Sequence, residues 1–176
     1  EKDGVEVKWQ PPNYSKNYKG IISLRQALVH SNNLAAINLV TDLGLKTLLK
    51  NFRKFGIKNV PQDMSIALGT LNLSPLELAK YYTSFANKGL QVDTHIIDYI
   101  EHNKEVVHEY SPSTKAITSP QQAYLMTNIL KNVVDGGTGI RARVKGIDIA
   151  GKTGTTNDNI DGWFAGYSPT IETVVW

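Results

Sequence analysis

The chain has 176 residues, of which 41% are hydrophobic and 20% are charged, as expected for one folded domain rather than a disordered segment. It contains no cysteine, which excludes disulfide scaffolds, thiolate metal sites and cysteine nucleophiles. The net charge of +3 is too small over this length to indicate a nucleic-acid-binding protein. No apolar run approaches the roughly 18 residues that a membrane-spanning helix needs.

The first part of the chain is predicted to be an extended segment followed by helices. Residues 1–20 contain turn-forming residues without periodicity, whereas apolar residues recur at helical spacing from Ile21 to Leu43. The polar stretch Ser31-Asn32-Asn33 interrupts this pattern, so we expect two helices with a polar break between them. A third, amphipathic helix is predicted from Leu45 to Phe55, ending at Gly56.

Two capping boxes predict the starts of two further helices. Residues 74–77 (Ser-Pro-Leu-Glu) and 119–122 (Ser-Pro-Gln-Gln) each offer a serine N-cap, a proline at the first helical position and a Glu or Gln three residues after the serine. Between these helices, residues 94–101 and 105–110 flank a polar turn and predict a short hairpin.

The last part of the chain is predicted to form three strands, over residues 146–151, 162–167 and 171–176. Short polar loops join them, which favours antiparallel pairing, so the expected fold class is α+β, with helices packed on an antiparallel sheet. The final residues resemble the middle of a buried strand. We therefore expect residues 1–176 to be part of a single domain that is truncated at both ends.

A basic run, Arg141, Arg143 and Lys145, precedes these strands. Its alternation is interpreted as the solvated face of a strand, and the alternative is a positive field that helps anionic peptides to dock. The histidines, which show no metal-like spacing in one helix, are assigned surface or packing roles; they are His30, His95, His102 and His108.

One segment with candidate chemistry admits two interpretations. Residues 146–153 match the P-loop pattern G-x-x-x-x-G-K-T, which would indicate a nucleotide-binding protein. A P-loop needs a helix that begins at the lysine, because the helix amides hold the phosphate, and no helical pattern follows here. We favour the other interpretation, Lys152-Thr153-Gly154-Thr155 at the end of a strand. There, Lys and Thr side chains can bind a carboxylate and a backbone N–H can stabilise an oxyanion.

Lys-Thr-Gly is one of three motifs, with Ser-x-x-Lys and a Ser-x-Asn-type motif, that penicillin-binding proteins and class A β-lactamases share. Two Ser-x-Asn phrases are present, at residues 15–17 and 31–33. The first lies in a polar loop, whereas the second lies in the break between two apolar-faced helices, where side chains can be held rigidly. We therefore choose Ser31 and Asn33.

On these motifs the chain resembles the transpeptidase domain of class A (bifunctional) penicillin-binding proteins. The resemblance runs through almost the whole chain, in residues 18–36, 67–70, 74–79, 86–89, 137–139, 150–156 and 161–167. It implies part of the fold shared by penicillin-binding proteins and serine β-lactamases. It also implies a peptidoglycan D,D-transpeptidase that works through an acyl-serine intermediate, and that β-lactams acylate.

The resemblance assigns roles to six residues. Ser31 would relay protons, Asn33 would hold the donor amide, and Lys152 would keep the site positive. Thr153 and Thr155 would bind the donor carboxylate, Gly154 would let the ligand approach the backbone, and the Thr155 N–H would form half of the oxyanion hole. No metal or cofactor is implied.

The same resemblance implies partners and a location. The expected ligands are stem peptides ending in D-Ala-D-Ala and β-lactam antibiotics. The full-length protein would carry an upstream glycosyltransferase domain and a membrane anchor. It would lie on the extracytoplasmic face of the cytoplasmic membrane, in the bacterial cell envelope.

The sequence departs from the family pattern in one respect, because no Ser-x-x-Lys occurs in the 176 residues. We expect the nucleophilic serine and its lysine in an upstream segment, so that this chain alone is inactive. The alternative is a pseudoenzyme or a noncatalytic cell-wall-binding module. A class A β-lactamase is disfavoured because no Glu-x-x-Leu-Asn element lies between Asn33 and Lys152.

Overall fold

The computed structural model describes residues 11–13, 17–156 and 160–176. Most of the expected extended segment, the Ser-x-Asn phrase at 15–17 except its last residue, and the polar residues 157–159 therefore lie outside the described part. Within the described ranges, no helix combines the length and the apolar character needed to cross a membrane.

Three helices and a short 3-10 helix form the first half of the fold. They are α1 (Leu24–Val29), α2 (Asn33–Leu43), α3 (Leu45–Phe55) and η1 (Met64–Leu68). The predicted break between α1 and α2 is confirmed, and so is the end of α3 at Gly56, which has the left-handed conformation with φ +83°. The short helix η1 has no clear periodicity in the sequence and was not predicted.

Both predicted capping boxes are present and begin the two helices that cover the sheet. Helix α4 (Pro75–Ala86) is capped by Ser74 and Glu77, and α5 (Pro120–Gly136) by Ser119 and Gln122. In each helix the serine side chain accepts a bond from the N3 backbone while the N3 side chain accepts one from the N-cap N–H.

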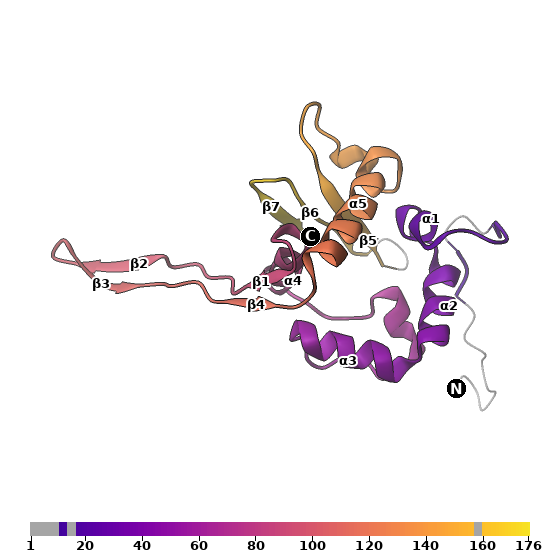
Figure 1. Ribbon diagram of the computed structural model, residues 1–176, viewed down its shortest axis with the longest axis horizontal. Coiled ribbons are helices and arrows are strands. Elements are labelled where there is room, and N and C mark those ends of the chain that lie inside the picture. Colours follow the sequence, from indigo (N-terminus) through magenta and orange to yellow (C-terminus); the bar gives the residue numbers. More distant parts are fainter. Residues whose placement is uncertain (1–10, 14–16, 157–159) are drawn as a thin grey trace.

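The C-terminal strands form one antiparallel sheet in the order β5–β6–β7, with β5 (Ala150–Thr155), β6 (Gly162–Tyr167) and β7 (Glu172–Val175). Helix α5 packs along β5 and α4 packs against β6 and β7 (Figure 1). A buried cluster of Leu130, Ala150 and Tyr167 joins α5 to the sheet, and Thr127 Oγ1 lies 2.7 Å from the Tyr167 hydroxyl. The predicted α+β class with an antiparallel sheet is confirmed.

The first strand of this sheet differs from its predicted position. Residues 146–149 precede the strand, Gly146 has φ +81°, and β5 runs from Ala150 to Thr155. The position of β5 is set by its partner strand, because β6 pairs with it in register from Ala150↔Tyr167 to Thr155↔Gly162. Residues 152–155 are therefore part of the strand instead of following it.

The prediction that the basic run, Arg141, Arg143 and Lys145, forms the face of a strand is also wrong. Ile140–Ala142 form one turn of 3-10 helix, η2, and Arg143 to Gly146 continue as a loop. The Ala142 N–H donates to Gly139 O and the Arg143 N–H donates to Ile140 O, which closes this turn directly after α5. The alternation of basic and other residues at positions 141–145 therefore does not indicate a strand.

The predicted hairpin is confirmed and forms an arm that protrudes from the molecule (Figure 1). Its strands are β2 (Tyr99–His102) and β3 (Glu105–Glu109), joined by Asn103 and Lys104 at φ +52° and +69°. Two residues with positive φ fit the tight turn whose twist matches that of paired strands. At the base of the arm β1 (Leu90–Val92) pairs with β4 (Thr114–Ala116), a pair too short to be recognised from the sequence.

A partly buried carboxyl group in β7, that of Glu172, predicts that stability depends on pH. Glu172 Oε1 is buried without a hydrogen-bond partner in the described structure, and burial raises the pKa of Glu172 from 4.5 to about 7. We expect Glu172→Gln to raise the free energy of unfolding by about 1–2 kcal/mol at pH 8, less than the full shift implies because the carboxyl is partly exposed.

The direction of this pH effect on the free energy of unfolding follows from the ionisation of Glu172. The folded state disfavours the charged carboxylate, so its destabilising effect grows as pH rises from 4.5 to about 7 and is absent below 4.5. Thermal unfolding across pH 4–8 checks this, with Glu101→Gln on the exposed arm as control. An advantage of Glu172→Gln that does not shrink toward pH 4 would contradict the assignment.

Candidate active site

The Ser31-Asn32-Asn33 phrase forms the tight connection between α1 and α2. Ser31 has φ +51°, a left-handed conformation that costs a non-glycine residue about 1 kcal/mol. The Asn32 N–H donates to Ala27 O at 2.8 Å, and the Asn32 side chain accepts from Ala35 N at 2.9 Å to cap α2. These bonds hold Ser31 in a strained turn, a feature that concentrates at functional sites.

Lys152 reaches this turn from the sheet. Its Nζ donates to Ser31 Oγ at 2.9 Å and to Thr153 O at 2.9 Å, so the fold joins two motifs that lie 121 residues apart in the chain. Burial lowers the pKa of Lys152 from 10.5 to about 8. This amine, with its lowered pKa, therefore lies within hydrogen-bond distance of the Ser31 hydroxyl, as a proton relay requires.

The outer edge of β5 carries free backbone groups. Among the described strands β5 pairs only with β6, and the Thr156 N–H points toward that side, donating to Asp161 O at 3.2 Å. Successive N–H groups of a strand point to opposite edges, so the Thr155 and Thr153 backbone groups face the unpaired edge. Thr153 O accepts from Lys152 there, and the Thr155 N–H is available to an oxygen of a ligand.

Thr138, in the turn after α5, contacts both β5 and the end of α1. Thr153 Oγ1 donates to Thr138 Oγ1 at 2.7 Å, and the Thr138 N–H donates to Val29 O, at the end of α1, at 3.2 Å. Sequence reasoning assigned no role to Thr138, although residues 137–139 were part of the family resemblance. The sequence feature that could have indicated this turn is Gly137, directly before Thr138.

The close approach of this turn to α1 predicts a packing effect. A Cβ on Gly137 would lie 2.4 Å from Val29 O, whereas a Cβ on Gly136 would meet nothing within 4 Å. We expect Gly137→Ala to lower the free energy of unfolding by about 2 kcal/mol, as overpacking does, and Gly136→Ala to have no such cost. Thermal denaturation of the two variants checks this, and equal melting temperatures would contradict it.

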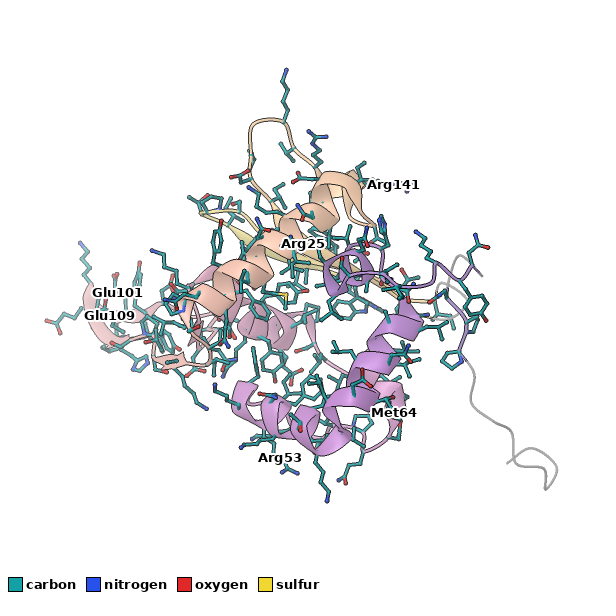
Figure 2. The ribbon with its side chains drawn as sticks, turned by 45° about the vertical axis from the view of Figure 1, so that its right-hand side comes forward. Arg25, Arg53, Met64, Glu101, Glu109 and Arg141 are labelled. Carbon is teal, nitrogen blue, oxygen red and sulfur yellow. The ribbon has the colours of Figure 1, made fainter. Side chains whose placement is uncertain are left out.

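Helix α1 is fastened to α5 by one arginine. Arg25 Nη1 donates to Asn128 Oδ1 at 2.8 Å and to Asn132 Oδ1 at 2.7 Å, and Figure 2 shows Arg25 beside α5. Together with the Thr138–Val29 bond, this contact sets where the Ser31 turn meets β5. Sequence reasoning missed Arg25, because its partners lie over 100 residues away.

Asn33 occupies a different position from that of Ser31. It is the first residue of α2, its side chain is half-buried, and its Nδ2 donates to Pro12 O at 3.0 Å. Among the described residues no hydrogen bond joins Asn33 to Ser31 or Lys152. Asn13 also attaches the segment around Pro12 to the start of α2, since its Oδ1 accepts a hydrogen bond from the Leu34 N–H at 3.1 Å. Within the described ranges, no donor contacts the Asn33 Oδ1.

A hollow of about 310 Å³ lies beside Ser31, and its lining includes Lys19, Gln26 and His30. The geometry contradicts the P-loop alternative, because Gly151, Lys152 and Thr153 lie within a strand and not at the start of a helix. What the site brings together is a serine hydroxyl, an amine with a lowered pKa, two threonines and a free strand edge.

The chain matches the family model described as penicillin binding protein transpeptidase domain over residues 2–176. It is 39% identical to penicillin-binding protein 1A of Neisseria meningitidis over 177 residues, and 40% identical to penicillin-binding protein 1A of Aquifex aeolicus over 169 residues. Each match covers 96% of this chain, but 22% and 23% of the respective relatives. The chain thus spans about a fifth of the length of these relatives.

Solved structures give the same assignment. The crystal structure of penicillin-binding protein 1A from Haemophilus influenzae superposes with a TM-score of 0.88 at 25% identity, covering 99% of this chain and 32% of that one. The imipenem acyl-enzyme complex of penicillin-binding protein A from Mycobacterium tuberculosis has the same fold, with a TM-score of 0.81 at 22% identity, covering 98% of this chain and 45% of that one. The chain belongs to the penicillin-binding protein transpeptidase domain family.

Proposed function

We propose that this chain supplies two of the three catalytic motifs of a peptidoglycan D,D-transpeptidase. The observation that carries the proposal is the 2.9 Å contact between Lys152 Nζ and Ser31 Oγ, which joins the Lys-Thr-Gly strand to the Ser-x-Asn turn. The nucleophilic serine and its lysine come from a Ser-x-x-Lys segment outside these 176 residues. No metal or cofactor takes part.

Ser31 and Lys152 fit the proton transfers of the proposed reaction, whose nucleophile lies outside these 176 residues. The nucleophilic serine attacks the carbonyl carbon of the penultimate D-Ala, forming an ester as the C–N bond breaks. Ser31 passes the serine's proton to the leaving amine of the terminal D-Ala, and Lys152 supports this relay with its positive charge. The amine of a second stem peptide then attacks the ester, which forms the cross-link and frees the serine.

The edge of β5 holds the donor. The hydroxyl groups of Thr153 and Thr155 bind the terminal carboxylate, and Gly154 lets the peptide lie close to the strand because no side chain intervenes. The Thr155 N–H stabilises the oxyanion that develops on the attacked carbonyl. Its direction toward the unpaired edge of β5 supports this role.

Labelling with a fluorescent penicillin tests the proposal. The 176-residue chain should show no covalent band on a denaturing gel, whereas a longer protein that contains it together with the Ser-x-x-Lys segment should be labelled stoichiometrically. Labelling of the short chain would mean that a residue within it is the nucleophile, and would overturn the motif assignment.

The second candidate function is a noncatalytic cell-wall-binding module or a pseudoenzyme. The observation that favours it is the absence of Ser-x-x-Lys from the sequence. If the longer protein binds isolated peptidoglycan but is not labelled by penicillin, this second function replaces the first.

The partners and location that we propose for the whole protein rest on the family resemblance, and the similarity to penicillin-binding protein 1A of other bacteria supports them. We assign it a glycosyltransferase domain and a membrane anchor before the transpeptidase domain, of which residues 1–176 form a part. In that arrangement the site faces peptidoglycan at the outer surface of the cytoplasmic membrane, where β-lactams reach it.

A further inference from the structure

A cavity larger than the hollow beside Ser31 lies at the root of the β2–β3 arm, and Lys152 does not line it. Its volume is about 870 Å³, against about 310 Å³ for the hollow beside Ser31. The walls come from the connections that follow α3 and precede α4, from α4 itself, from β1 and the residue after it, and from the segment around β4. None of the six proposed site residues lines it.

The wall of this cavity is polar and held in place by bonds between elements. Gln91 in β1 is only 6% exposed, and its Nε2 donates to Phe55 O at the end of α3 at 3.0 Å. Asp93 accepts from Lys80 of α4 and from Ser113, which precedes β4. A wall fixed in this way loses little conformational freedom when a ligand binds.

The cavity lining carries three lysines, Lys58, Lys80 and Lys115, against two carboxylates, Glu77 and Asp93, which leaves a net charge of +1. Of its lining lysines, only Lys80 has a carboxylate partner in the described structure; Lys115 Nζ contacts the Lys54 carbonyl at 3.5 Å, and Lys58 makes no ion pair there. The adjacent helix α3, LKTLLKNFRKF, adds four cations and no acid, and Figure 2 shows Arg53 on its outer side. The rim therefore favours an anion.

The uncharged polar groups of the lining indicate what kind of anion would fit. They are amides, hydroxyls and one phenol, contributed by Asn59, Asn72, Thr70, Ser113, Gln91 and Tyr81. Such groups bind the hydroxyls and amides of a sugar or peptide, an aromatic ring can stack on a sugar, and lysines pair with carboxylates. The cavity is large enough for a ligand of several such units, more than a single phosphate ion requires.

We propose that this cavity is a second binding site for peptidoglycan, which holds an anionic glycopeptide segment apart from the peptide that reacts near Lys152. The choice of glycopeptide rests on the proposed function, whereas the existence of the site rests on the cavity and its charges. Binding here would keep the strand on the protein while its peptides enter and leave the reacting site.

Calorimetric titration of the 176-residue chain with a soluble disaccharide-tetrapeptide tests this proposal. We expect Lys58→Ala/Lys115→Ala to raise the Kd about tenfold, the scale for two exposed charge contacts. Arg143→Ala/Lys145→Ala removes the same charge from a distant loop and should leave the Kd within about twofold. A neutral chitotetraose should bind more weakly, and its binding should not change in Lys58→Ala/Lys115→Ala.

Three outcomes would overturn the proposal. The first is an equal Kd in the wild type and the Lys58/Lys115 variant, and the second is an equal loss of affinity in the Arg143/Lys145 control. The third is loss of binding in Lys152→Ala, which would place the glycopeptide at the reacting site. Penicillin labelling of the longer protein is independent of all these measurements, so failure of the second site and failure of the transpeptidase function can be told apart.

Discussion

Ser31→Ala should slow acylation by penicillin about 10²- to 10⁴-fold in a longer protein that includes the Ser-x-x-Lys segment, the range for loss of a positioned proton-transfer group. Ser31 Oγ lies 2.9 Å from Lys152 Nζ, an amine whose pKa burial lowers to about 8. Removing the hydroxyl breaks the connection through which a proton would move. The second-order rate constant of acylation, measured with a fluorescent penicillin, gives the effect directly.

Two controls separate proton transfer from folding. Ser15→Ala, in the Ser-x-Asn phrase that we did not choose, should leave the acylation rate unchanged. Since Ser31 has φ +51°, Ser31→Gly relieves the backbone strain and also removes the hydroxyl, so it should be as slow as Ser31→Ala while melting no lower. A normal rate in Ser31→Gly, or a slow Ser15→Ala, would show that the wrong motif was assigned.

The sequence predicts the helices and the class of the fold because these depend on short-range chemistry. Ser74 and Ser119 each start a helix with a complete capping box, and Gly56 ends one in the left-handed conformation. Such signals involve residues at most four positions apart, so they can be recognised without knowing the fold. The antiparallel order of the last strands likewise follows from their short connections.

The strand positions and the supporting contacts depend on partners elsewhere in the chain. Residues 146–149 alternate like a strand, but β6 selects Ala150–Thr155, which moves the lysine motif into the strand. Lys152 and Ser31 were predicted to share a site only through family resemblance, and their contact required the fold. The contacts of Arg25 with Asn128 and of the Thr138 N–H with Val29 also join residues over 100 positions apart, so a local pattern could not predict them.

Asn33→Ala should slow acylation by about 10²- to 10³-fold, the scale for deleting one preorganised polar contact in a transition state. Its Nδ2 already donates to Pro12 O at 3.0 Å, which leaves Oδ1 to accept the N–H of the donor's amide. The bond to Pro12 also fixes the orientation of the carboxamide. We therefore expect the substitution to lower the rate constant of acylation without unfolding the protein. The melting temperature should stay within a few degrees of that of the wild type, because the Asn33 side chain is only half-buried.

Asn13→Ala distinguishes this role from simple anchoring of the preceding segment. Asn13 attaches the same segment to α2 through the Leu34 N–H at 3.1 Å and is 6% exposed, so its loss should lower the melting temperature. It offers nothing to a substrate at Asn33, and acylation should stay within a few-fold of the wild type. If Asn13→Ala is as slow as Asn33→Ala, Asn33 acts by holding Pro12 in place, and the substrate contact assigned to its Oδ1 is wrong.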